Sequence, residues 1–278
     1  MRKVIPALLG LALVIAACGS DEVEPFALVA SSNGSIGVGE QRVLFALINT
    51  ETDEFLAAPD RPATVTIRDE NGAPLETYPL EFIWTIPDVR GLYVATVNLP
   101  EAATYQATID AEGLASAGPI GLVTAEDPPL IEPGEQAPAS ETRTSEEFPD
   151  LSIITSDTEP DPAMYELTVA EAVTGGSPSV IVFATPAFCV SQACGPLLDQ
   201  VKALRSDYPE VGFVHVEIYE DLQVSSPEEL TVVPATSEWG LPSEPWVFVI
   251  DAEGVVSASF EGAASDTELT AAIDAVSG

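Results

Sequence analysis

Two cysteines separated by four residues are the side chains best suited to chemistry in this chain of 278 residues. They lie in the segment Cys189-Val-Ser-Gln-Ala-Cys194, and thiols so close in sequence can form a disulfide or exchange electrons with other thiols. The apolar run 179–185 predicts a buried strand before them, and the spacing over 194–208 predicts a helix after them. Because a helix N-terminus stabilises a thiolate, we expect Cys189 to be the nucleophile and Cys194, in or near the first turn, to be the resolving thiol.

The third cysteine, Cys18, follows an export signal. Met1-Arg2-Lys3 is a short cationic start, and 4–17 is an apolar run that is too short for a comfortable membrane span. Residues 1–17 are therefore predicted to be a signal peptide, and Ile15-Ala-Ala-Cys18 resembles the lipobox of bacterial lipoproteins, in which the cysteine carries the lipid. We expect an extracytoplasmic protein anchored to the cell membrane through Cys18, with 18–25 as a tether. The other two cysteines then form an even pair in an oxidising compartment.

The chain contains one histidine, His215, which excludes any site that needs two imidazoles. Together with the two cysteines it could offer thiolate and imidazole ligands to copper, as in a class of thioredoxin-fold copper-delivery proteins. Those proteins use a shorter cysteine spacing and a histidine from a later loop. A lone histidine on a central strand is typical of hydrogen-bonded packing, so we expect no metal and no cofactor.

The charge of the chain excludes several classes of partner. There are 45 Asp or Glu residues and 9 Lys or Arg residues, for a formal charge of −36. Nucleic acids and anionic membrane faces are held by clustered Lys and Arg, so neither is expected as a partner. The hydrophobic content of 46% is too high for a disordered acidic tail, so the chain is expected to fold.

Residues 26–124 read as short strands separated by turn signals. Alternation is clear in 63–68 and 104–109, and Asn71-Gly72 is a tight-turn signal between two strands. The predicted strands cover 26–30, 42–48, 63–68, 75–84, 92–98, 104–109 and 120–124. Seven strands without a helical run predict an antiparallel β-sandwich that resembles the immunoglobulin-like modules of exported bacterial proteins, and this resemblance carries no site motif.

Two further regions follow the strands, which gives a two-domain organisation. Proline and like charge over 125–150 predict an extended, poorly packed linker. From 151 to 278 the pattern changes to strands that alternate with helices, as in an α/β fold. The predicted elements there are a helix over 168–175, a strand over 179–185, a helix over 194–208, strands over 211–219, 246–251 and 255–260, and a helix over 265–276.

This C-terminal region resembles the thioredoxin superfamily, especially anchored extracytoplasmic members from bacteria. Cys189 follows a buried strand and precedes a helix, where that family keeps its attacking thiol, and Pro196 occupies the place of its helix-kinking proline. Pro245 precedes a strand and takes the place of the family's cis-proline, which faces the active cysteines. The cysteine spacing departs from the family's C-x-x-C motif by two residues, so a bridge requires Cys189 in the loop or a locally unwound helix.

The resemblance implies thiol–disulfide exchange with exported proteins, which would dock as extended strands beside Pro245. Glu244 could face the cysteines and slow attack by its charge. Three alternatives stay open: a binding or scaffold protein with a structural disulfide, copper binding, and a peroxidase. The spacing also resembles a peroxiredoxin subgroup, but Pro186 stands where its motif has threonine and no arginine follows Arg205.

Overall fold

The computed structural model describes residues 25–30, 36–224 and 226–278. The predicted signal peptide, Cys18 and the tether up to residue 24 lie outside these ranges, so export and lipidation stay predictions. Within the described ranges, no helix combines the length and the apolar content needed to cross a membrane.

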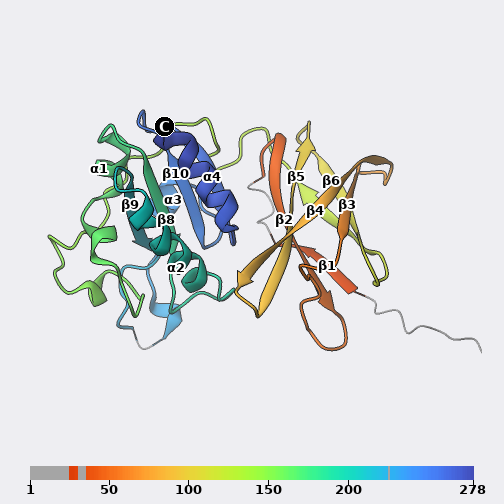
Figure 1. The fold of residues 1–278 in the computed structure, drawn as a ribbon, viewed down its shortest axis with the longest axis horizontal. Coiled ribbons are helices and arrows are strands. Elements are labelled where there is room, and N and C mark those ends of the chain that lie inside the picture. Colours follow the sequence, from red (N-terminus) through yellow and green to blue (C-terminus); the bar gives the residue numbers. More distant parts are fainter. Residues whose placement is uncertain (1–24, 31–35, 225) are drawn as a thin grey trace, which may run out of the picture.

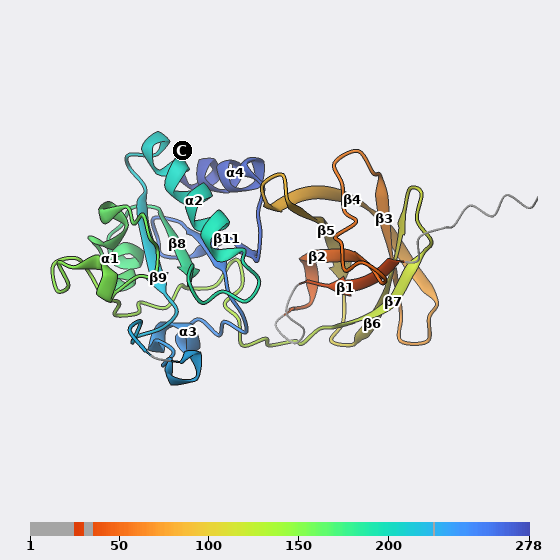
Figure 2. The same ribbon diagram turned by 90° about the horizontal axis from the view of Figure 1, so that it is seen from below.

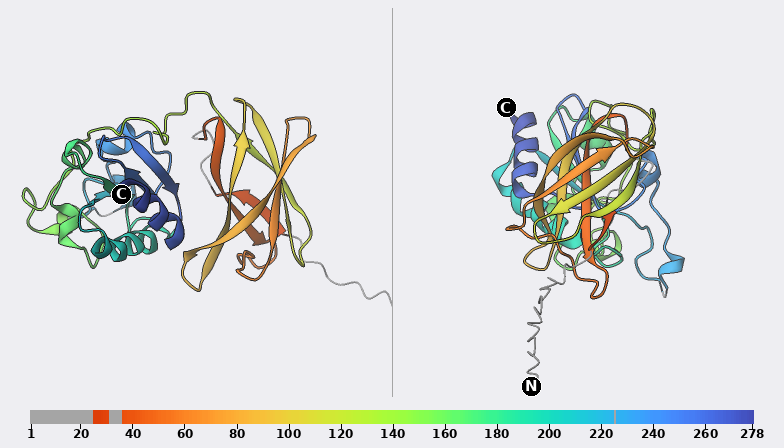
Figure 3. Two further views of the ribbon diagram at one scale, coloured as in Figure 1. Left: turned by 45° about the horizontal axis from the view of Figure 1, so that its top comes forward. Right: turned by 90° about the vertical axis from the view of Figure 1, so that its right-hand side faces the viewer.

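The elements form two groups, each built on its own sheet, and the two groups lie side by side (Figures 1 and 3). We call residues 25–124 the β part and residues 125–278 the α/β part. The strands of the β part are β1 Pro25–Val29, β2 Gly39–Asn49, β3 Ala63–Arg68, β4 Pro74–Ile86, β5 Arg90–Leu99, β6 Thr104–Ala111 and β7 Ala117–Val123. All seven predicted strands are present.

The β part is one antiparallel sheet in the order β1-β2-β5-β4-β3-β6-β7. The long strand β4 joins its two halves, because Pro74–Leu80 pairs with β3 while 81–86 pairs with β5. The sheet curls until its ends approach each other, where Ile36 pairs with Thr124. The all-β class predicted from sequence is therefore correct, whereas the strands form a nearly closed sheet around one core rather than two separately bonded sheets. An immunoglobulin-like relation stays a prediction.

Strand β2 shows why the outer face of this sheet matters. Residues 43–47 are consecutively buried, although a half-exposed strand would alternate. Val43, Phe45 and Leu47 face the core of the β part, whereas Leu44 and Ala46 belong to a second apolar cluster. That second cluster includes Ala263 of the α/β part, so the outer face of the sheet packs against the other group.

The α/β part is a four-stranded sheet with helices on both faces (Figure 2). Its elements are α1 Val169–Thr174, β8 Ser179–Ala184, α2 Cys194–Leu204, β9 Gly212–Glu217, α3 Pro234–Glu238, β10 Trp246–Ile250, β11 Val256–Glu261 and α4 Asp266–Ser277. Single 3-10 turns lie at Leu151–Ile153, Pro162–Tyr165, Arg205–Asp207 and Pro227–Glu229.

The strand order is β11-β10-β8-β9, with β8 parallel to β9 and antiparallel to β10. Helices α2 and α4 pack on one face of this sheet, and α1 and α3 pack on the other. Every residue of β8 is buried, as its continuous apolar run predicts. The sequence strand–helix–strand, connection, strand–strand–helix is the thioredoxin-like arrangement that was predicted.

The segment 125–150 packs closely onto the α/β part, unlike the loose linker predicted from its composition. Leu130 and Ala137 are buried in the cluster around Trp239. The Gly134 amide donates to the Val256 carbonyl at 2.8 Å, and the Ala137 amide donates to the Gly254 carbonyl at 2.9 Å. A few apolar side chains and backbone hydrogen bonds to β11 and the turn before it suffice to hold a segment whose average composition is polar.

Candidate functional site

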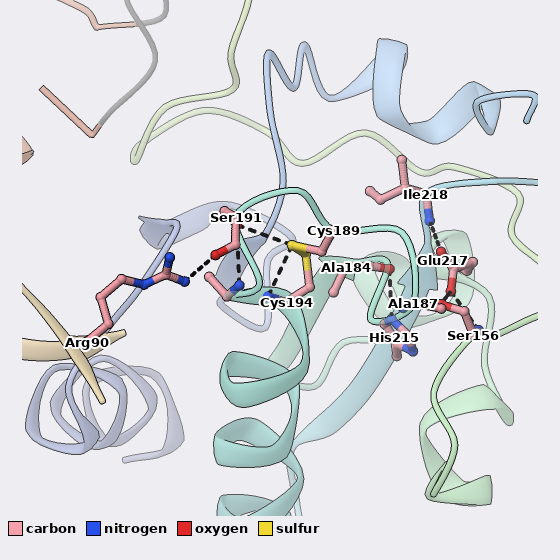
Figure 4. Close-up of a disulfide and its surroundings, with 11 residues drawn as sticks. Arg90, Ser156, Ala184, Ala187, Cys189, Ser191, Cys194, His215, Glu217 and Ile218 are labelled. Atoms are coloured by element: carbon pink, nitrogen blue, oxygen red, sulfur yellow. Dashed lines mark hydrogen bonds between the residues drawn. A yellow bond between two sulfur atoms is a disulfide. The ribbon is translucent and has the colours of Figure 1, made fainter. Parts of the chain in front are cut away.

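Cys189 and Cys194 form a disulfide at the C-terminal end of β8, with their Cα atoms 6.0 Å apart (Figure 4). Cys189 lies in the loop 185–193 and Cys194 is the first residue of α2, which is one of the two arrangements that the long spacing required. The loop turns back at Gln192, whose φ of 59° is in the left-handed region. The two residues beyond a C-x-x-C motif are thus accommodated in the loop, and the helix stays regular.

The two sulfur positions differ in access to solvent. Cys194 has no exposed surface and packs among apolar side chains of α2 and the sheet, whereas Cys189 is partly exposed. Val190, next to Cys189, is 94% exposed, so the loop projects from the surface. An external thiolate can therefore approach Cys189 from solvent and cannot approach Cys194.

Hydrogen-bond donors surround the accessible sulfur. The backbone amide of Cys194 donates to Cys189 Sγ at 3.3 Å, from the first turn of α2. Ser191 Oγ lies 3.2 Å from the same sulfur and accepts the Ala193 amide at 3.3 Å. These dipoles stabilise negative charge on Cys189 Sγ whenever that sulfur is a free thiolate. The role of Ser191 was missed in the sequence, because a serine between the cysteines has no motif of its own.

Pro245 immediately precedes β10, and the Glu244–Pro245 peptide bond is cis, as predicted. The Pro245 carbonyl accepts the Gly262 amide at 2.8 Å, which ties this segment to the end of β11. Ser243 and Glu244 line the same cavity as Ser191 and Ala193 of the cysteine loop. The proline segment and the cysteine loop therefore face a common space.

A buried carboxyl group, Glu217, is linked to the start of the cysteine loop through Ser156 (Figure 4). Its side chain accepts the Ser156 amide and hydroxyl, both at 2.7 Å, and the Ser156 hydroxyl accepts the Ala187 amide at 3.1 Å. Burial raises the pKa of Glu217, although its hydrogen bonds oppose the shift. Burial, and then the charge of Glu217, also raises the pKa of Glu244. The sequence placed Glu217 on β9 but offered no sign that it reaches the loop through Ser156.

His215 is a packing residue beneath the end of β8. Its Nε2 donates to the Ala184 carbonyl at 3.1 Å, and its Nδ1 accepts the Tyr165 hydroxyl at 2.7 Å. Burial lowers the pKa of His215 to about 4, so the ring is neutral at physiological pH. Both ring nitrogens are thus engaged in the fold. Among the described residues, no group of three or more His, Cys, Asp or Glu side chains is arranged to hold a metal ion.

The β part reaches the cysteine loop through Arg90, at the start of β5. The Arg90 guanidinium donates to the Ser191 carbonyl and lies over the Phe55 ring, with 5.2 Å between the guanidinium carbon and the ring centre (Figure 4). A second link joins Arg42 of β2 to Glu268 of α4, with Nε–Oε1 at 2.7 Å and Nη2–Oε2 at 3.1 Å. Neither link could be found from the sequence, because the partners are separated by 101 and 226 positions.

Partial matches to solved structures include two proteins of different kinds. One is the crystal structure of a thioredoxin-family thiol:disulfide interchange protein from Chlorobium tepidum TLS, at 19% identity and a TM-score of 0.29, over 44% of this chain and 100% of that chain. The other is a metagenome-derived glycoside hydrolase family 9 endoglucanase, at 14% identity and a TM-score of 0.22, over 35% of this chain and 18% of that chain. No model of a known family and no curated protein matches the chain. The strand order and the positions of the two cysteines and Pro245, rather than these scores, characterise the site.

Proposed function

We propose that this protein carries out thiol–disulfide exchange through Cys189 and Cys194. The observation that carries the proposal is the difference in solvent access between the two cysteines. Cys189 is partly exposed and its sulfur accepts a hydrogen bond from the Cys194 amide, whereas Cys194 has no exposed surface. A bridge whose only role is to hold the chain together needs no such difference. A reactive bridge does, because one sulfur must be attacked and the other must leave.

The exchange is a pair of substitutions at sulfur. A client thiolate attacks Cys189 Sγ, the Cys189–Cys194 bond breaks, and the electron pair leaves on Cys194. A second client thiolate then attacks the client sulfur of the mixed disulfide and releases Cys189. The client is oxidised to a disulfide and the protein is reduced to a dithiol; the reverse sequence reduces a client disulfide.

Trapping distinguishes this role from a structural one. Cys194→Ala leaves Cys189 without its resolving partner, so the variant is expected to accumulate mixed disulfides with cysteine-containing peptides. Cys189→Ala is the matched control and is expected to accumulate none, because Cys194 is buried. Equal trapping by both variants, or by neither, would contradict the assigned order of attack.

The second candidate is a structural disulfide in a binding or scaffold protein. The bridge closes a loop over a sequence separation of only 5, for which chain entropy contributes about 2 kcal/mol. A redox titration separates the two functions, since structural bridges lie below about −300 mV. A potential above that value is expected here.

We further propose that the protein is a lipid-anchored, extracytoplasmic protein of two domains, with the β part as one domain and a thioredoxin-like domain following it. The lipobox-like residues before Cys18 support the anchor, and the separate cores of the two sheets support the division. The clients would then be thiols or disulfides of exported proteins. Mass spectrometry of the N-terminal peptide tests the lipid, and Cys18→Ala is expected to release the protein from the membrane.

A further inference from the structure

A cavity of about 330 Å³ lies between the outer face of the β part and the cysteine loop. The β part contributes an apolar wall that includes Leu28, Ala30, Leu44, Ala46, Ile48 and Leu92. The α/β part contributes the opposite wall, which includes Ser191 and Ala193 between the cysteines and Ser243 and Glu244 before Pro245. The volume is at the lower end of the range for ligand-binding cavities, so a few side chains rather than a large cofactor would fit.

Two polar groups on the cavity wall have no hydrogen-bond partner within 25–30, 36–224 and 226–278. Thr85 is 8% exposed, and its hydroxyl has no hydrogen-bond partner among the described residues. The Nε–H of Arg90 is also buried, with no acceptor in the part of the chain that the structure describes. A buried polar group without a partner costs free energy, and buried polar groups in folded proteins are almost always paired. Both groups can donate, so a ligand that supplies acceptors beside apolar surface matches this wall.

The charges around the cavity favour a neutral acceptor. Arg90 contributes one positive charge to the lining, whereas Glu244 and Glu261 contribute two carboxyl groups. An anionic ligand such as a fatty acid would meet repulsion from these carboxylates. A backbone carbonyl satisfies the two donors without bringing a charge. An extended peptide with an aliphatic side chain meets both requirements.

We infer that this cavity is a specificity pocket of the exchange site: it binds an aliphatic side chain adjacent to the client's cysteine, and Thr85 and Arg90 bind the client backbone. This inference rests on the proposed exchange at Cys189. It assigns the β part a direct role in selecting clients, because most of the apolar wall belongs to β1, β2 and β5.

Peptide disulfides of one design test the pocket. Each peptide has one cysteine capped by thionitrobenzoate, and Leu, Ser or Asp stands beside that cysteine, in one series before it and in another after it. Cys189 of the reduced protein attacks the peptide sulfur and releases the coloured thionitrobenzoate, and Cys194 then attacks Cys189 to release the peptide thiol. The small disulfide 5,5′-dithiobis(2-nitrobenzoate) measures exchange without a peptide.

The readout is the ratio of each peptide rate to the small-disulfide rate. In the wild-type protein, the Leu peptide of one series is expected to react at least about tenfold faster than its Ser and Asp counterparts. Ala30→Phe fills the cavity and is expected to remove this preference. Thr85→Val keeps the shape but loses the hydroxyl, and is expected to lower the Leu ratio about fivefold. Thr108→Val in β6, which does not line the cavity, is the matched control and should leave the ratio unchanged.

The outcomes separate the pocket from the chemistry. If the reduced wild-type protein fails to react even with the small disulfide, the proposed function is wrong. If it reacts with the small disulfide but shows no Leu preference, or if Thr85→Val and Thr108→Val have equal ratios, the pocket assignment is overturned. Stoichiometric binding of decanoate without a peptide preference would identify the occupant as a lipid chain and would also overturn it.

Discussion

The ion pair between Arg42 and Glu268 is expected to hold the β part against the α/β part. Arg42 makes two contacts with the Glu268 carboxylate and donates to the Ala263 carbonyl at 2.9 Å, and only 17% of the Arg42 side chain and 25% of the Glu268 side chain are exposed. Arg42→Met keeps an unbranched side chain and removes the guanidinium. The Glu268 carboxylate loses the two donors of Arg42 and keeps those of Ser265, while the Ala263 carbonyl loses the Arg42 donor, and this change costs about 2–3 kcal/mol.

A double-mutant cycle isolates the pair from these side effects. With Arg42→Met, Glu268→Gln and the double variant, urea unfolding near pH 7 should give a coupling free energy of about 1–2 kcal/mol. Urea is used because an ionic denaturant would screen the pair. Arg205→Met is the matched control: Arg205 pairs with Asp161 inside the α/β part at 2.7 Å, with 38% of its side chain exposed, and should cost less than about 1 kcal/mol.

The pH dependence of the coupling has a definite sign. Burial alone would raise the pKa of Glu268, but the hydrogen bonds and charge of Arg42, followed by the hydrogen bonds from Ser265, outweigh burial and hold the pKa below its usual value of 4.5. A lowered folded-state pKa contributes stability above the unfolded value, and that stability is lost as the pH falls through the folded pKa. The coupling should therefore decline as the pH is lowered through the folded-state pKa of Glu268. A coupling below about 0.3 kcal/mol near pH 7, or one that survives acidification, would refute the assigned contact.

Three further perturbations address the site and the packing. Burial raises the pKa of Glu217, so the stability of the wild-type protein should rise as the pH falls through the folded-state pKa towards the unfolded value. Glu217→Gln should reduce that rise in thermal melts, and identical slopes would contradict the assignment. Trp239→Phe should lower the free energy of unfolding in urea by about 2–3 kcal/mol, because it removes a fully buried indole that donates to Ser140 Oγ at 3.2 Å. A loss below about 1 kcal/mol would argue against that packing. Glu244→Gln removes a carboxyl group that lines the cavity beside the cysteine loop, so it should accelerate the reduction of anionic glutathione disulfide about two- to threefold at low salt. The gain should vanish in about 1 M salt, because salt screens the charge, and a salt-independent gain would rule out a charge effect.

Several features of the site were predictable because they depend on neighbours along the chain. The helix caps are an example: Thr168 and Glu171 form the capping box of α1, and Ser265 and Glu268 form that of α4, both as their spacing predicts. The burial of β8 follows from its apolar run, and the loop position of Cys189 follows from the boundary between that strand and α2. Each of these signals spans only a few residues.

The apolar run 43–47 shows how a correct strand prediction can still miss its consequence. The residue types indicated a strand but did not say what would cover its second face. In the structure, that face packs against Ala263 and lines the cavity beside the cysteine loop. The segment 125–150 was predicted to be loose from its average composition. A few of its residues, such as Leu130, nevertheless pack into the core of the α/β part, and an average over the segment does not reveal them.

The amino-acid order alone was thus sufficient for the strands and helices, for their order in the α/β part and for the place of the cysteine pair between β8 and α2, because hydrogen-bond periodicity and capping are local. Tertiary folding alone determined which sulfur meets solvent, that Glu217 supports the loop through Ser156, and that Arg90 reaches the Ser191 carbonyl across 101 positions. The Arg90 contact depends on the docking of the two sheets, whereas the Glu217–Ser156 contact and the burial of Cys194 depend on packing within the α/β part. Both kinds of packing are the sum of many weak contacts between distant segments, and no short sequence pattern contains that sum.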